Sequence, residues 1–97
     1  MKAVFIVYNQ ALSEQVQELL RRVNVRGYTR WDGVKGTGTH EGEPHLGTHT
    51  WPAINSSMLC VTTDAKAAEL MQQCRQLNEL APEQGLKAFR WEVEDIV

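Results

Sequence analysis

Apolar residues occur along this chain in two kinds of pattern, short dense runs and longer stripes with helical spacing. Residues 1–8 (MKAVFIVY) form an apolar run rich in β-branched and aromatic residues, which predicts a strand buried on both faces. From Leu12 to Val23 the apolar residues follow helical spacing, with polar residues opposite, and Gly27 is the expected stop. Residues 28–35 (YTRWDGVK) look extended again.

The second half of the chain repeats this order. Residues 58–62 (MLCVT) predict a third strand, and Asp64 is the expected N-cap of a second helix. An apolar stripe then runs to Leu77, and the helix should end before Pro82. Residues 86–93 (LKAFRWEV) predict the fourth strand.

The order of these elements indicates an α+β, ferredoxin-like βαββαβ fold over a single domain, residues 1–97. We expect a four-stranded antiparallel sheet with both helices on one face and a long loop between strands 2 and 3. The other face of the sheet would be open, and its apolar residues need a cover. Because a chain of this length has a small core, self-association through that face is the expected remedy.

The loop between strands 2 and 3, residues 36–55 (GTGTHEGEPHLGTHTWPAIN), shows no sustained period and contains four glycines and two prolines. Loops of this length are commonly functional or disordered. All three histidines, His40, His45 and His49, fall within ten residues of it. Neutral imidazoles could bind a divalent transition metal such as Zn, Ni or Cu. The alternative is a solvated polar loop that tolerates histidine.

Composition narrows the range of functions. Ten Lys and Arg against twelve Asp and Glu give a net charge of -2, with no basic stripe, so a nucleic-acid partner is not expected. No nucleophile motif or acid–base constellation stands out, so we expect no enzymatic activity. Cys60 and Cys74 fit buried, reduced core positions. With no signal-like or membrane-spanning run, a cytoplasmic protein is expected.

The three tryptophans fall in two settings. Trp31 and Trp91 lie in predicted strands, where they would be core or subunit-interface residues. Trp51 lies in the loop, where it would anchor the loop on its own subunit or contribute to a partner surface.

Three short segments resemble the PII signal-transduction family. Val34-Lys35-Gly36-Thr37-Gly38 is similar to the family's Val-Lys-Gly-Phe-Gly, and Gly27-Tyr28-Thr29 is similar to its Gly-Met-Thr. Residues 87–93 (KAFRWEV) are similar to its Lys-Ile-Phe-Val-Phe-Asp-Val. With the matching element order, the resemblance covers nearly the whole chain.

The resemblance implies a regulatory homotrimer whose sheets meet around a central axis. It implies inter-subunit clefts for a small-molecule effector, an adenine nucleotide or a metal ion, with Gly36, Gly38 and Lys87 as ligand-binding residues. A T-loop-like segment at about 36–57 would contact a partner such as a membrane transporter or an enzyme. Within it, Glu41, Glu43 and Trp51 are the candidate contact residues.

The departures from the family pattern bear on the effector. Gln84-Gly85-Leu86 replaces the glycine-rich turn before Lys87, and Asp95 stands where the first C-terminal arginine would be. Both changes argue against carrying over ATP and 2-oxoglutarate sensing. The alternative function is that of a trimer resembling the CutA divalent-cation tolerance family, which would use the loop histidines. A small hydrolase or isomerase is a distant third.

Overall fold

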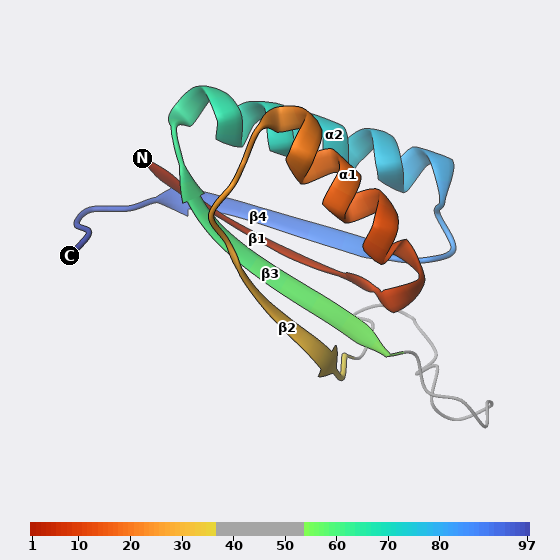
Figure 1. Cartoon of the computed structure of the whole chain (residues 1–97). Coiled ribbons are helices and arrows are strands. Elements are labelled where there is room, and N and C mark those ends of the chain that lie inside the picture. The colour runs from red at the N-terminus through yellow and green to blue at the C-terminus, as the bar shows by residue number, and fades with distance from the viewer. Residues whose placement is uncertain (37–53) are drawn as a thin grey trace.

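Two helices cover one face of a four-stranded antiparallel sheet (Figure 1), so the predicted ferredoxin-like βαββαβ fold is confirmed. The computed structural model describes residues 1–36 and 54–97. The elements in chain order are β1 (Lys2–Asn9), a 3-10 turn (Gln10–Leu12), α1 (Ser13–Val23), β2 (Thr29–Val34), β3 (Asn55–Thr62), α2 (Asp64–Leu80) and β4 (Leu86–Glu92). No helix in these two ranges is long and apolar enough to span a membrane.

The strand order is β2-β3-β1-β4, and every neighbouring pair is antiparallel. Because side chains alternate along a strand, Val4, Ile6 and Tyr8 of β1 point under the helices, where they are fully buried. Phe5 and Val7 point to the opposite, open face. The two chain ends lie at one end of the sheet, and β2 finishes and β3 starts at the other (Figure 1).

Helix α1 packs on the sheet through the apolar stripe that the sequence predicts. The helix stops earlier than Gly27, since Asn24 takes the left-handed conformation (φ 67°) and its backbone N–H bonds to the carbonyls of Leu20 and Arg21. Asparagine is one of the few residues that tolerate this conformation at a helix end. The expected stop at Gly27 was therefore wrong by three residues.

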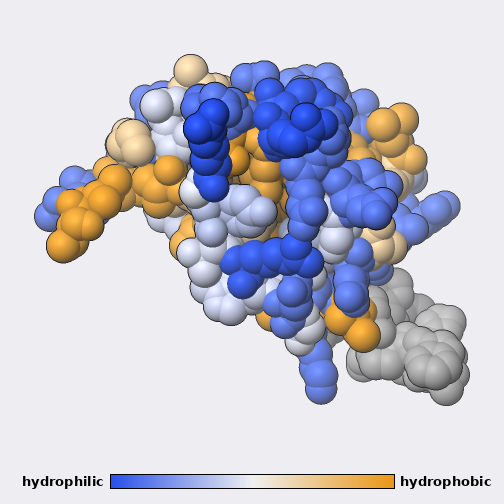
Figure 2. All heavy atoms as spheres, viewed as in Figure 1, coloured by the Kyte–Doolittle hydropathy of each residue, from blue (hydrophilic) through white to orange (hydrophobic). Residues whose placement is uncertain are grey.

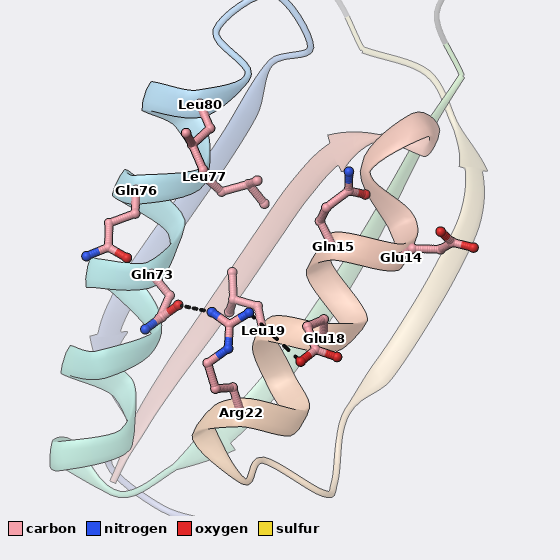
Figure 3. A pocket seen from close by; sticks show the side chains of 9 residues that line it. All are labelled: Glu14, Gln15, Glu18, Leu19, Arg22, Gln73, Gln76, Leu77 and Leu80. Carbon is pink, nitrogen blue, oxygen red and sulfur yellow. Dashed lines mark hydrogen bonds and ion pairs between the residues drawn. The ribbon is translucent and has the colours of Figure 1, made fainter.

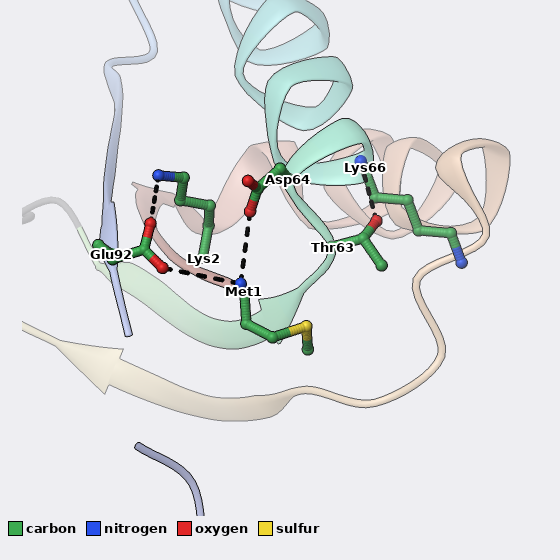
Figure 4. A network of polar contacts seen from close by, with 6 residues as sticks. All are labelled: Met1, Lys2, Thr63, Asp64, Lys66 and Glu92. Carbon is green, nitrogen blue, oxygen red and sulfur yellow. Dashed lines mark hydrogen bonds and ion pairs between the residues drawn. The ribbon is translucent and has the colours of Figure 1, made fainter. Parts of the chain in front are cut away.

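Helix α2 starts with Thr63 as its N-cap, where the sequence analysis expected Asp64. The Thr63 hydroxyl oxygen accepts a hydrogen bond from the backbone N–H of Lys66 at 3.2 Å (Figure 4). Asp64 instead occupies the first turn, where a carboxylate is favoured by the helix dipole. Its Oδ1 lies 3.4 Å from the N-terminal ammonium of Met1.

A second ion pair in the same region joins the first residue of β1 to the last residue of β4. The Lys2 ammonium donates to Glu92 Oε1 at 2.6 Å, which joins β1 to β4 beside the start of α2 (Figure 4). This contact lowers the pKa of the Glu92 carboxyl and raises that of Lys2.

Strand β3 begins at Asn55, three residues before the Met58 start that the sequence predicts. Ser56 and Ser57 have no apolar signal, yet both are buried. Their burial follows from ladder pairing with Tyr8 and Val7 of β1. Residues 55–57, placed in the T-loop-like segment from the sequence, therefore belong to the sheet.

The two cysteines are core residues, as predicted. Cys60 of β3 and Cys74 of α2 are free and buried between sheet and helices. Burial raises the pKa of the Cys74 thiol to about 12. A thiol in this state is a poor nucleophile and acts as a small apolar side chain.

The helical layer presents mainly hydrophilic side chains to solvent (Figure 2). The large exposed apolar residues of strands β2, β3 and β4 belong to the open face of the sheet. The two sides of the molecule therefore differ in character, and the open face is the apolar one.

Candidate functional site

Gly36 lies two residues after the last residue of β2, Val34, at the end of the sheet where β3 begins. A Cβ placed on Gly36 would lie 2.9 Å from Nδ2 of Asn55, the first residue of β3. Any side chain at this position has to displace the Asn55 amide. Glycine therefore keeps an exposed stretch of backbone here, which is the condition for close approach of a phosphate or similar anion.

A polar network that the sequence analysis missed joins β2 to β3 just before Gly36. Asp32 Oδ1 accepts hydrogen bonds from Arg30 Nε at 2.8 Å and from Ser56 Oγ at 2.9 Å. The Arg30 guanidinium and the Ser56 hydroxyl hold the pKa of the Asp32 carboxyl below its ordinary value.

The Asp32 network lies at an irregular part of β2. The register with β3 shifts between Trp31 and Val34, and Gly33 takes a φ of 70°. The network therefore holds an irregular strand end in a defined position beside Gly36. The only sequence signal was the Arg-x-Asp spacing, since Ser56 comes from another strand.

Lys87 lies near the start of β4, opposite Val7 in the ladder with β1. Because it alternates with buried Leu86, its exposed side chain belongs to the open face of the sheet. Gly85, with a φ of 77°, makes the turn into the strand, and its carbonyl accepts from the backbone N–H of Asn9 at 3.3 Å. Gly85, the one glycine in Gln84-Gly85-Leu86, thus adopts a conformation that other residues rarely adopt.

Gly36 and Lys87 lie at the same end of the sheet but at opposite edges. Strands β3 and β1 separate β2 from β4, and three strand spacings amount to about 14 Å. One chain therefore does not bring these two predicted ligand-binding residues together. Only a second copy of the chain could place a Lys87 next to this Gly36.

Aromatic side chains gather on the open face of the sheet. The ring centroids of Phe5 and Phe89 are 6.5 Å apart. Trp31 is 44% exposed and Trp91 is 49% exposed. Of the two alternatives for these tryptophans, a place in the core of their own subunit was therefore wrong, and a place in a subunit interface remains.

The remaining predicted site residues lie in 37–53, outside the described residues. They are Gly38, His40, Glu41, Glu43, His45, His49 and Trp51. Within residues 1–36 and 54–97, no group of three His, Cys, Asp or Glu side chains is arranged to hold a metal ion. The histidine hypothesis stays a prediction from sequence.

A comparison with protein families gives one match, over residues 1–97, to the family described as nitrogen regulatory protein P-II. No curated protein sequence matches the chain significantly.

Several solved structures share the fold. CPII from Thiomonas intermedia K12, bound to ADP, AMP and acetate, is 19% identical with a TM-score of 0.71, covering 92% of this chain and 81% of that one. The same protein bound to ADP and bicarbonate is 21% identical with a TM-score of 0.71, covering 93% and 82%. A putative PII-like signalling protein from Thermus thermophilus is 22% identical with a TM-score of 0.65, covering 93% and 83%.

Proposed function

Because this chain belongs to the nitrogen regulatory protein P-II family, we propose that it is a homotrimeric regulatory protein that binds an adenine nucleotide between subunits. The family is regulatory, and no catalytic constellation appears among the described residues. The trimeric assembly, the bound effector and the signal to a partner protein are each supported by a different feature of the chain.

The open face of the sheet supports the trimer. Phe89 and Trp91 of β4 and Trp31 of β2 are each about half exposed in the single chain. Exposed apolar surface of this kind marks an interaction site, because its removal from water favours association. Sheets that meet around a common axis would cover it.

The observation that carries the ligand proposal is the placement of Gly36 and Lys87. They lie at one end of the sheet on opposite edges, so neighbouring subunits could bring one of each together. Gly36 would allow the backbone close to a phosphate, and the Lys87 ammonium would neutralise its charge. Gly38 would extend the same segment.

The ligands of the CPII structures support the choice of effector. CPII is bound to ADP, AMP and acetate in one structure and to ADP and bicarbonate in another. We therefore assign an adenine nucleotide as the effector of this chain, with a small carboxylate-like anion as a second ligand.

The T-loop-like segment would pass the signal to a partner protein. Its roots are Gly36 after β2 and Asn55 at the start of β3, next to the proposed nucleotide site. Binding would shift the segment between states that a partner distinguishes. Glu41, Glu43 and Trp51 remain the candidate partner contacts, and the target would be a transporter or an enzyme.

Calorimetric titration with ADP and AMP, with and without bicarbonate, tests the ligand proposal. We expect Lys87→Ala to weaken ADP binding by about tenfold or more, because a phosphate charge loses its partner. Arg75→Gln is the matched control. It removes the same charge from the exposed side of α2, where Arg75 bonds only to Gln72 among the described residues.

Light scattering tests the assembly separately. The trimer predicts a mass of three times 11.0 kDa. A monomer in solution would contradict the inter-subunit site, and equal ADP affinity in the Lys87→Ala variant would show that Lys87 is not part of it.

A further inference from the structure

A groove of about 510 Å³ lies between α1 and α2, on the side of the molecule opposite the open sheet face (Figure 3). Its walls come from Glu14, Gln15, Glu18 and Arg22 of α1 and from Gln73 and Gln76 of α2. Leu19, Leu77 and Leu80 supply the apolar part of its lining.

One end of the groove is bridged and the other is open. At the bridged end, Arg22 Nη1 donates to Gln73 Oε1 at 2.7 Å, across the two helices (Figure 3). The opposite end lies between the first turn of α1, with Glu14 and Gln15, and the last turn of α2, with Leu77 and Leu80. No bond between the helices closes that end within residues 1–36 and 54–97.

The open end exposes an apolar side chain. Leu80 is 82% exposed, the largest value of any leucine in the described parts of the chain. Leu77, one turn earlier, packs partly against the core. The two leucines form an apolar strip that leads from the core to the surface and has no cover in the single chain.

The charge at the open end is negative. Glu14 forms no ion pair with any described residue, whereas the charge of Glu18 is balanced by Arg21 and Arg22. The last turn of α2 carries no basic residue. Its terminal carbonyls add the negative end of the helix dipole.

We propose that this groove is a docking site for a basic amphipathic α-helix of a partner protein. An apolar strip between two helices, open at the end away from the Arg22–Gln73 bond, matches the helix-in-groove mode, in which leucine-like residues at i, i+3, i+4 and i+7 fill the groove. Lysine or arginine residues beside that strip would lie against Glu14 and the end of α2. The nucleotide site proposed above would lie at the end of the sheet, and neither Gly36 nor Lys87 lines the groove.

The probe for this proposal is a fluorescent 18-residue peptide with leucine at those spacings and lysine elsewhere, followed by anisotropy. We expect Leu80→Asp and Glu14→Lys each to weaken binding by about tenfold. Glu69→Lys is the control, since Glu69 is exposed on α2 and does not line the groove, and it should bind within about twofold of the wild type. A peptide with glutamate in place of lysine should bind at least about tenfold more weakly.

Three results would overturn the proposal. Unchanged affinity in Leu80→Asp would place the peptide elsewhere, and an equal loss in Glu69→Lys would show that only overall charge matters. A change of mass in Leu80→Asp, measured by light scattering without peptide, would show that the groove is an interface between copies of this chain. ADP binding in the same variants separates these outcomes from failure of the nucleotide site.

Discussion

Asp32 is the residue that fixes the end of β2 to the start of β3. One carboxylate oxygen accepts from Arg30 of its own strand and from the buried Ser56 of the next. A buried hydroxyl without a hydrogen-bond partner lowers the free energy of unfolding. We therefore expect the ionised state of Asp32 to matter for the stability of this region.

The pH dependence of unfolding tests this at Asp32. Hydrogen bonds in the folded state lower its pKa from the ordinary value of 3.8. As the pH falls, the unfolded chain thus takes up the proton first. The stabilisation is complete above about pH 5 and is lost as the pH falls below 3.8 through the folded pKa. Asp32→Asn should remove this part of the stability that the protein loses at acid pH.

Urea unfolding midpoints at several pH values below about 6 provide the measurement. Asp95→Asn is the matched control, because Asp95 is exposed and forms no ion pair within the described ranges. If the urea midpoint of Asp32→Asn fell with decreasing pH as steeply as that of the wild type, the hydrogen bonds of Asp32 would not stabilise the fold as proposed.

The loop histidines yield a second prediction at this scale. If His40, His45 and His49 bind a divalent transition metal, titration with Zn²⁺, Ni²⁺ and Cu²⁺ gives a heat that is lost in a His45→Ala, His49→Ala double variant. Binding should also weaken below about pH 6.5, because imidazole must be neutral to bind the ion. No heat, or heat that both mutations leave unchanged, would remove the hypothesis.

At the scale of elements, two adjacent residues at the start of α2 are of types that favour the N-cap position, but only one of them caps the helix. Thr63 makes the capping bond to the Lys66 N–H, and Asp64 lies inside the helix. Thr63→Ala should lower the free energy of unfolding by about 1 kcal/mol, because a first-turn N–H loses its acceptor. Thr63→Ser, which keeps the hydroxyl, is the control.

Chemical unfolding monitored by circular dichroism measures the change. An effect of Thr63→Ala no larger than that of Thr63→Ser would contradict the assignment of Thr63 as the cap.

The elements themselves could be predicted from sequence because burial repeats with the period of each structure. The pattern failed where burial had another cause. Ser56 and Ser57 are buried by pairing with β1, so the start of β3 was placed three residues late. Choosing between Thr63 and Asp64, or between Asn24 and Gly27, depends on backbone geometry that residue types alone do not determine.

The candidate site shows the same limit. Gly36 and Lys87 came from a resemblance of short segments, and strand order then separates them by two strands. Asp32 was missed because its partner Ser56 lies 24 residues further along the chain. Contacts between distant segments of this kind carry no local sequence signal.

At the scale of the whole molecule, the sheet divides two surfaces. Its open face carries the exposed aromatic residues of β2 and β4, and the helices on the other face enclose the groove. Assembly through the first surface would leave the second free for a partner. The nucleotide would lie at the sheet end, where the edges of neighbouring subunits meet.

Complementation between two inactive variants tests the central claim, that the nucleotide site is shared between subunits. Gly36→Glu and Lys87→Glu should each abolish ADP binding, because each places a repelling carboxylate in every site. Mixed trimers, formed by refolding the two variants together in equal amounts, contain some interfaces where an unchanged Gly36 meets an unchanged Lys87. Random assembly predicts recovery of about one quarter of the wild-type sites, measured as the ADP stoichiometry in calorimetry. Mixed trimers of correct mass that bind no ADP would contradict a site built from Gly36 of one subunit and Lys87 of the next.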